Sequence, residues 1–164
     1  MRSQTAFDRY CETTYKPAAS TALVLLRVTL GLQLFLAGIE KIATGWNAEG
    51  YLLGATGPLA EWFHSLAGSG LLSQLNVWGL TLVGLALILG LAVRPASFFG
   101  AIMMGMYYLA HFEQNTEHGL VDYHLIYIAV FLLFLCGGAG RFFGLDAYVS
   151  RVVRNKWIQA VLFG

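Results

Sequence analysis

The apolar run from Leu125 to Cys136 constrains the fold more than any other part of the sequence. It contains no charged residue, and a surface helix of a soluble protein could not carry it. With its flanks, over residues 120–148, the segment reaches the ~20 mostly apolar residues that a helix needs to cross a bilayer. Its titratable groups lie at the two ends, where water or lipid headgroups can satisfy them. The run therefore predicts a transmembrane helix.

The composition also indicates a membrane protein. Of the 164 residues, 57% are hydrophobic and only 12% are charged, whereas about 25% are charged in soluble domains. The mean hydropathy is +0.64. The net charge of +1 gives no reason to expect a nucleic-acid partner. The length fits one membrane domain, residues 21–148, between an N-terminal tail (1–20) and a basic C-terminal tail (149–164).

Four apolar segments predict an all-α fold, an integral-membrane bundle of four transmembrane helices. We place the first three spans at about 21–43, 72–93 and 96–111, with a very short turn at Arg94-Pro95 between the second and third, and His124 begins the fourth. In the first outer loop, the spacing of a helix face predicts a short amphipathic helix in the membrane interface, formed by Leu59, Trp62, Phe63 and Leu66.

Charge asymmetry predicts the orientation of this bundle. Four spans place both termini on the same side of the membrane. Basic residues gather in the two tails and at Arg94, whereas the two opposite loops hold only Lys41. The positive-inside rule therefore places both termini in the cytoplasm. We expect a multi-pass protein of the plasma membrane, surrounded by lipids, with its four histidines in the outer half.

Glu40 and Lys41 lie at the outer end of the first span. One interpretation is an interfacial anchor, in which the lysine reaches the headgroups and the glutamate faces water. The other is that Glu40 points inward, on the same helix face as Gln33, which lies two turns earlier. In that case these residues would line a polar pocket suited to a quinone or to proton transfer.

Arg27 is the deepest charge, about two turns inside the first span. A charge in the middle of a span costs ~2.5–3.5 kcal/mol on insertion scales, so it needs a partner or a path to water. The side chain could extend to the inner headgroups. Alternatively it faces inward, where it would bind an anionic group or organise the bundle.

Histidines gather around the second outer loop, at His111, His118 and His124, together with Asp122. Imidazole and carboxylate groups suit proton relay. His111 ends one span and His124 begins the next, so we expect the two to be near neighbours. Tyr127 follows His124 by three residues on the same helix face. Such a pair can hydrogen-bond a quinone carbonyl, although histidines at helix ends can also simply face the headgroups.

Metal, haem and thiol chemistry find little support in the sequence. The histidine spacings match no metal motif, and a bis-histidine haem would need histidines that face each other across helices. Cys11 and Cys136 form no CxxC pair, and we expect both to be free thiols. The glycine-rich segment 137–140 does not follow a strand, so we expect it to cap a helix and not to bind a dinucleotide.

Three segments, taken together and in order, resemble the DoxX-like family of small four-helix membrane proteins, of which DoxD is a branch. They are LLRVTLGLQLFLAGIEKI, LILGLAVRPASFFGAIMM with its Gly-x-x-x-Arg turn, and GGAGRFFGLDAYV. The resemblance implies a helical bundle associated with redox complexes, and the DoxD branch includes the membrane subunit of thiosulfate:quinone oxidoreductase. It also implies that polar positions of the family correspond here to Arg27, Glu40, Lys41 and Arg94.

Together these features predict a small integral-membrane subunit of a redox complex, with a quinone or quinol site near the outer leaflet. Electrons would come from other subunits of the complex. The candidate catalytic residues are Glu40, His111 and His124, and the candidate quinone-binding residues are Gln33, Lys41, Tyr127 and Arg27.

The alternative is a non-catalytic accessory subunit, so the sequence leaves open whether the chain is an enzyme. On the third span, small residues recur every four positions at Ser97, Ala101 and Gly105. A stripe of this kind lets helices approach closely. In the accessory interpretation, the stripe would pack against a larger membrane assembly.

Overall fold

The computed structural model describes residues 16–113 and 121–153. Within these residues the fold is all-α and contains no strand, which confirms the predicted fold class at this level. Cys11 and His118 lie outside the described residues. The helices are α2 (Lys16–Thr44), α3 (Glu49–Leu53), α4 (Ala60–Ser65), α5 (Gly70–Leu89), α6 (Val93–Ala110), α7 (Tyr123–Gly137) and α8 (Asp146–Val152).

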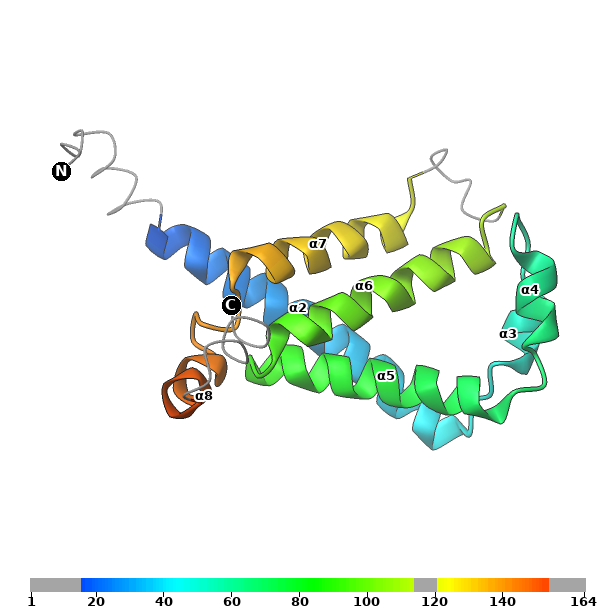
Figure 1. Ribbon diagram of the computed structural model, residues 1–164, viewed down its shortest axis with the longest axis horizontal. Coiled ribbons are helices and arrows are strands. Elements are labelled where there is room, and N and C mark those ends of the chain that lie inside the picture. The colour runs from blue at the N-terminus through cyan, green and yellow to red at the C-terminus, as the bar shows by residue number, and fades with distance from the viewer. Residues whose placement is uncertain (1–15, 114–120, 154–164) are drawn as a thin grey trace.

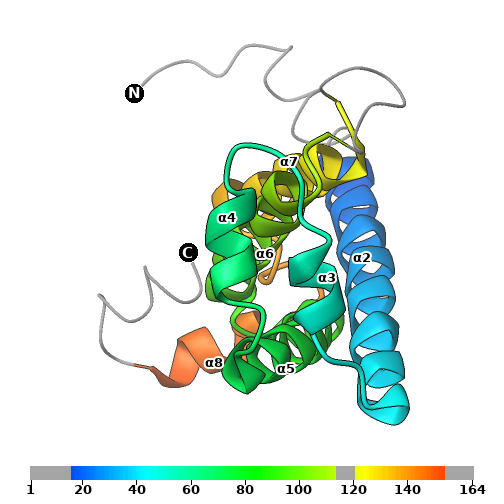
Figure 2. The ribbon, with the colours of Figure 1, turned by 90° about the vertical axis from the view of Figure 1, so that its right-hand side faces the viewer.

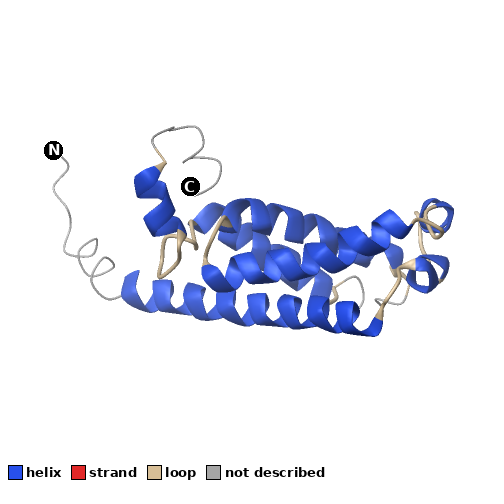
Figure 3. Ribbon diagram, turned by 90° about the horizontal axis from the view of Figure 1, so that it is seen from below, coloured by secondary structure: helices blue, strands red, loops and turns tan. Residues whose placement is uncertain are grey.

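The four longest helices form the body of the molecule (Figures 1 and 3). α2 packs along α5, α5 packs against α6, and α6 packs against α7. The short helices α3 and α4 lie together at one end of this body, whereas α8 lies near the other (Figure 1). Figure 2 looks at the molecule from the end that α3 and α4 occupy. We refer to the two ends as the α3/α4 end and the α8 end.

Helix length decides which helices can cross a membrane unaided. Among the described helices, Pro17–Thr44 and Gly70–Leu89 are long and apolar enough. α7 is apolar but has only 15 residues, fewer than the ~20 that a span needs. Two of the four spans that the sequence predicted therefore have the expected length and composition, and the four-span arrangement stays a prediction.

Caps at both ends explain why α7 is short. At its start, the carboxylate of Asp122 accepts hydrogen bonds from the backbone N–H groups of His124 (3.0 Å) and Leu125 (3.3 Å). This is a side-chain N-cap. At its end, Gly138 adopts the left-handed conformation with φ 59°. The glycine-rich segment thus caps a helix, as predicted.

Glycines bring α2 and α5 into backbone contact. A Cβ atom added to Gly31 would lie 2.9 Å from the backbone nitrogen of Ile88, and one added to Gly84 would collide with the backbone of Phe35. Small residues allow this close approach between membrane helices. The small-residue pattern of the sequence predicts such an approach for the third span.

The small-residue stripe on α6 faces the interior only in part. Ser97 is fully buried, whereas a Cβ atom on Gly105 would meet nothing within 4 Å. The tight contact of α6 is at Gly100, where a Cβ atom would collide with the ring of Phe131 on α7. Gly100, which the predicted stripe did not include, is therefore where α6 approaches α7 closely.

The turn between α5 and α6 lies earlier than predicted. Gly90 and Ala92 both adopt left-handed conformations, with φ 64° and 51°. Arg94 and Pro95 belong to the first turn of α6, where a missing N–H is tolerated because it has no partner within the helix. The side chain of Asp146 accepts hydrogen bonds from the amides of Ala92 (2.6 Å) and of the following residue (3.2 Å).

Arg27 joins α2 to the segment that follows α7. Its side chain is only 1% exposed. One guanidinium nitrogen donates to the carbonyls of Ala139 (2.6 Å) and Phe142 (3.1 Å), and the other donates to the carbonyl of Phe143 (3.2 Å). Asp146 also interacts electrostatically with Arg27. Of the two interpretations of this arginine, the structure agrees with the inward-facing one that organises the bundle.

The first connection contains two short helices where the sequence predicted one. α4 falls within the predicted amphipathic segment and has two distinct faces, because Phe63 is 3% exposed and Trp62 is 48% exposed. α3 was not predicted. It matters for the site because it carries Tyr51 toward α6, where the rings of Tyr51 and Tyr107 meet edge to face at 5.7 Å.

Candidate functional site

A cavity of about 250 Å³ lies toward the α3/α4 end, where α2, α6 and α7 converge. Four of the seven predicted site residues line it, and polar groups of several kinds face one space. The full lining is Gln33, Leu34, Ala37, Lys41, Trp46, Tyr51, Leu80, Met104, Tyr107, Tyr123, His124 and Tyr127. We call this space the polar cavity.

Gln33 and Tyr127 connect the two helices on either side of the polar cavity. The side-chain amide of Gln33 on α2 donates a hydrogen bond to the hydroxyl of Tyr127 on α7, with 2.6 Å between nitrogen and oxygen. Tyr127 and His124 both line the cavity, as their spacing on one helix face predicted. An amide and a phenol at this point can both hydrogen-bond a ligand carbonyl or hydroxyl.

His124 is held in place by the residue that caps α7. Its Nδ1 atom lies 2.5 Å from a carboxylate oxygen of Asp122, and the side chain is 7% exposed. The carboxylate therefore orients the ring and selects Nδ1 as its protonated nitrogen. A carboxylate and an imidazole in this order can pass a proton, with Nε2 as the atom that would meet a ligand.

Lys41 lines the cavity, whereas Glu40 does not. The ammonium group of Lys41 lies 3.3 Å from the ring centroid of Trp46, in a cation–π contact. Glu40 is exposed and absent from the lining. The structure thus differs from the prediction that Glu40 points inward, because adjacent residues of a helix point about 100° apart and here the lysine takes the inner position.

His111 lies just behind the cavity wall. It follows the last residue of α6, and its ring contacts the ring of Tyr51 at 4.2 Å between centroids. Burial, and to a lesser extent the nearby His124, lower the pKa of His111. The two histidines are therefore neighbours, as predicted, but only His124 lines the cavity.

Arg27 is not part of this site. It lies six residues before Gln33 on α2, about 9 Å along the helix toward the α8 end. Its guanidinium is occupied by the carbonyl groups that follow α7. The structure assigns it to the α8 end of the bundle, so it does not join the other predicted quinone-binding residues.

The sequence did not indicate three tyrosines that make up much of the wall, namely Tyr51, Tyr107 and Tyr123. Tyr107 contacts the rings of both Tyr51 and His124, and Tyr123 contacts Tyr127 at 5.9 Å between centroids. Burial raises the pKa of Tyr51. The four-residue spacing of Tyr123 and Tyr127 was a usable signal, because it places both on one helix face. Tyr51 could not be found this way, since α3 was not predicted.

Histidine, cysteine and carboxylate side chains do not cluster in the described part of the chain. Residues 16–113 and 121–153 contain no group of three histidine, cysteine or carboxylate side chains arranged to hold a metal ion. Cys136 is a free, exposed thiol, as expected.

Comparison with known families identifies the family of this chain. A family model described as DoxX matches residues 22–112. The chain belongs to the DoxX family. No curated protein and no solved structure matches it. The DoxX match covers α2 through α6 and ends before α7, so His124 and Tyr127 lie beyond the matched segment. Together with the apolar helices, membership of the DoxX family indicates a small membrane protein.

Proposed function

We propose that this DoxX protein is a small subunit of a membrane redox complex, and that its polar cavity binds the headgroup of a quinone or quinol. The observation that carries the proposal is the convergence of an amide, an imidazole and a phenol on one cavity, at Gln33, His124 and Tyr127. The amide and the phenol can donate hydrogen bonds to the oxygen atoms of a quinone ring, and Nε2 of His124 can accept one from the hydroxyl of a quinol. Leu34, Leu80 and Met104 supply apolar wall for the ring itself.

In this proposal the four long helices cross the bilayer with both termini in the cytoplasm. The polar cavity lies at the α3/α4 end, which then faces the outer leaflet. A quinone could reach it from the lipid phase, and Asp122 and His124 at the start of α7 would connect it to the aqueous side. This arrangement agrees with the positive-inside distribution of basic residues.

The chemistry divides between this chain and its partner. Reduction of a quinone to a quinol adds two electrons and two protons, one proton to each ring oxygen. A redox-active partner subunit supplies the electrons in this proposal. His124 transfers one proton between a ligand oxygen and Asp122, and water at the open side of the cavity exchanges the second proton with the other ligand oxygen. Gln33 and Tyr127 hold the ring in position. In quinol oxidation, the same groups act in the reverse direction.

The accessory-subunit alternative has less support. It relied on the stripe of small residues on α6 as a contact surface for another protein. Ser97 is fully buried within this chain, so it cannot contact another subunit. Gly105 has open space beside it, so it is the end of the stripe that could still contact another subunit.

Binding of a tail-less benzoquinone to the purified protein in detergent tests the proposal. Trp46 lines the cavity, so quenching of tryptophan fluorescence can report binding. We expect Gln33→Leu and His124→Leu each to weaken binding roughly tenfold, the equivalent of about 1.4 kcal/mol for a lost hydrogen bond.

Glu40→Gln is the matched control, because it alters a polar residue on the same helix that lies outside the cavity. It should leave the affinity unchanged. Circular dichroism would verify that each variant folds. Equal effects of Gln33→Leu and Glu40→Gln, or no binding to the unmodified protein, would exclude the polar cavity as the quinone site.

A further inference from the structure

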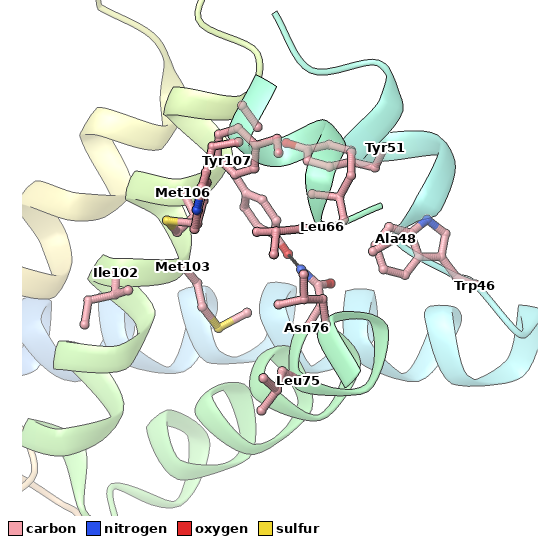
Figure 4. A pocket seen from close by; sticks show the side chains of 15 residues that line it. Trp46, Ala48, Tyr51, Leu66, Leu75, Asn76, Ile102, Met103, Met106 and Tyr107 are labelled. Atoms are coloured by element: carbon pink, nitrogen blue, oxygen red, sulfur yellow. Dashed lines mark hydrogen bonds between the residues drawn. The ribbon is translucent and has the colours of Figure 1, made fainter. Parts of the chain in front are cut away.

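A second and larger cavity adjoins the polar one. It has a volume of about 350 Å³ and lies between α3, α4, α5 and α6 (Figure 4). Asn76 is the single amide in its lining, which contains no charged residue. Most of the wall is aliphatic, sulfur-containing or aromatic, and includes Leu52, Phe63, Leu66, Leu72, Met103 and Met106. We call this space the apolar cavity.

The apolar cavity exists because α5 and α6 diverge. The two helices meet at their short turn at the α8 end and spread apart toward the α3/α4 end, where α3 and α4 cover the opening (Figure 1). The side-chain amide of Asn76 on α5 donates to the hydroxyl of Tyr107 on α6, at 2.5 Å (Figure 4). This hydrogen bond links the two helices across the cavity, and it leaves the side-chain oxygen of Asn76 buried without a hydrogen-bond partner among the described residues.

The two cavities share one aromatic wall. Trp46, Tyr51 and Tyr107 line both of them. On one side of these rings lie Lys41, His124 and the other polar groups, and on the other side lies the nearly uncharged apolar cavity. A polar compartment next to an apolar one matches a ligand with a polar head and a hydrocarbon chain.

The rim of the apolar cavity indicates where such a chain enters. Leu75 on α5 is 58% exposed and Ile102 on α6 is 48% exposed, and both belong to the lining. These residues lie on the outer surfaces of apolar helices, which face hydrocarbon in a membrane protein. The opening between α5 and α6 therefore faces the medium in which the chain of a membrane amphiphile resides.

We propose that the apolar cavity binds the hydrocarbon tail of the quinone whose headgroup occupies the polar cavity. This inference rests on the proposed function for the headgroup and adds a requirement to it, namely that the natural ligand carries a long chain. The tail would enter between α5 and α6 and pass the shared wall of Trp46, Tyr51 and Tyr107. A lipid acyl chain is the competing occupant.

The test compares a tail-less benzoquinone with the same ring carrying a decyl chain. Leu66→Trp fills the apolar cavity from α4's C-terminal side, and Leu75→Trp fills it from the rim, so one variant remains informative if the other folds poorly. Leu82→Trp is the matched control, since Leu82 lies on α5, is 57% exposed and does not line the cavity.

For each ligand, the quantity of interest is the ratio of variant Kd to wild-type Kd, because partitioning of the chain into detergent cancels in that ratio. We expect the cavity-filling variants to weaken binding of the decyl quinone roughly tenfold and to change the Kd of the tail-less ring by less than about twofold. Leu82→Trp should change neither ratio.

The outcomes separate this inference from the proposed function. If both filling variants leave the decyl quinone unaffected, or weaken both ligands equally, the tail site is excluded while the headgroup site stands. If Gln33→Leu has no effect on either ligand but Leu66→Trp still weakens the decyl quinone, the headgroup site is excluded and the chain site is supported. Mass spectrometry that finds a phospholipid retained by wild type and lost in Leu66→Trp would identify the acyl chain as occupant and overturn the quinone tail.

Discussion

Replacing Arg27 by methionine should destabilise the protein more than any other single change of a charged residue in its described part. Methionine has a similar length and suits an apolar environment, but it donates no hydrogen bond. The change leaves the carbonyls of Ala139, Phe142 and Phe143 without their donors. It also removes the positive charge that interacts with Asp146, whose carboxylate holds the start of α6.

The magnitude follows from the burial of this network. A hydrogen bond that involves a charged group contributes about 1.5–3 kcal/mol, but three bonds from one guanidinium do not add fully. Breaking a buried charged network typically costs about 3–5 kcal/mol. For a chain of this size, each kcal/mol lowers Tm by ~2–4 °C, so we expect a decrease of roughly 6–20 °C.

Thermal unfolding in detergent, followed by tryptophan fluorescence, measures this decrease. Arg141→Met is the control for loss of a positive charge near Asp146, because Arg141 is exposed and also interacts electrostatically with that carboxylate. Arg27→Lys should give an intermediate Tm, since an ammonium keeps the charge but cannot reach three carbonyls with a planar fork. A Tm for Arg27→Met equal to that of Arg141→Met would refute the organising role of this arginine.

Three further predictions concern the helices around the site. Gly100→Ala should lower the free energy of unfolding by about 1–3 kcal/mol, because a methyl group there collides with an α7 ring. Gly105→Ala, on the same helix and in open space, should be neutral or slightly stabilising in the same melts. Asp122→Ala should lower Tm through a lost cap worth about 1 kcal/mol and speed hydrogen exchange at the start of α7, with Asp122→Asn less affected. Because the pKa of His111 is lowered in the folded protein, the unfolded chain gains a proton first as the pH falls below about 6.5. The Tm of the wild type should therefore drop between pH 7 and pH 5.5. The drop should be smaller in His111→Gln.

Much of the architecture was readable from hydrophobic runs and local turn chemistry. The apolar runs and glycine turns located the four long helices to within a few residues, because these signals depend on near neighbours in the sequence. The lengths of these helices were less predictable from the sequence. α7 ends at Gly137, because the left-handed Gly138 stops the helix and the chain then folds back toward Arg27.

The site was predictable only where helical periodicity alone determines it. The shared face of His124 and Tyr127 followed from their spacing, and both line the polar cavity. The choice between Glu40 and Lys41 did not follow, because it depends on how α2 is rotated against α5. That rotation is determined by glycine contacts between helices far apart in the sequence, such as the one at Gly84.

The unequal lengths of α2 and α7 have a consequence for the surrounding lipid. At 1.5 Å per residue, the 29 residues of α2 extend ~43 Å and the 15 residues of α7 extend ~22 Å. The first length exceeds the ~30 Å thickness of the hydrocarbon core, and the second falls short of it. In the proposed four-span arrangement, this is a hydrophobic mismatch of opposite sign within one small protein. The bilayer then thins beside α7 while α2 tilts or extends into the headgroups. Thinning brings the aqueous boundary closer to His124, so membrane thickness itself should control how readily protons reach the polar cavity.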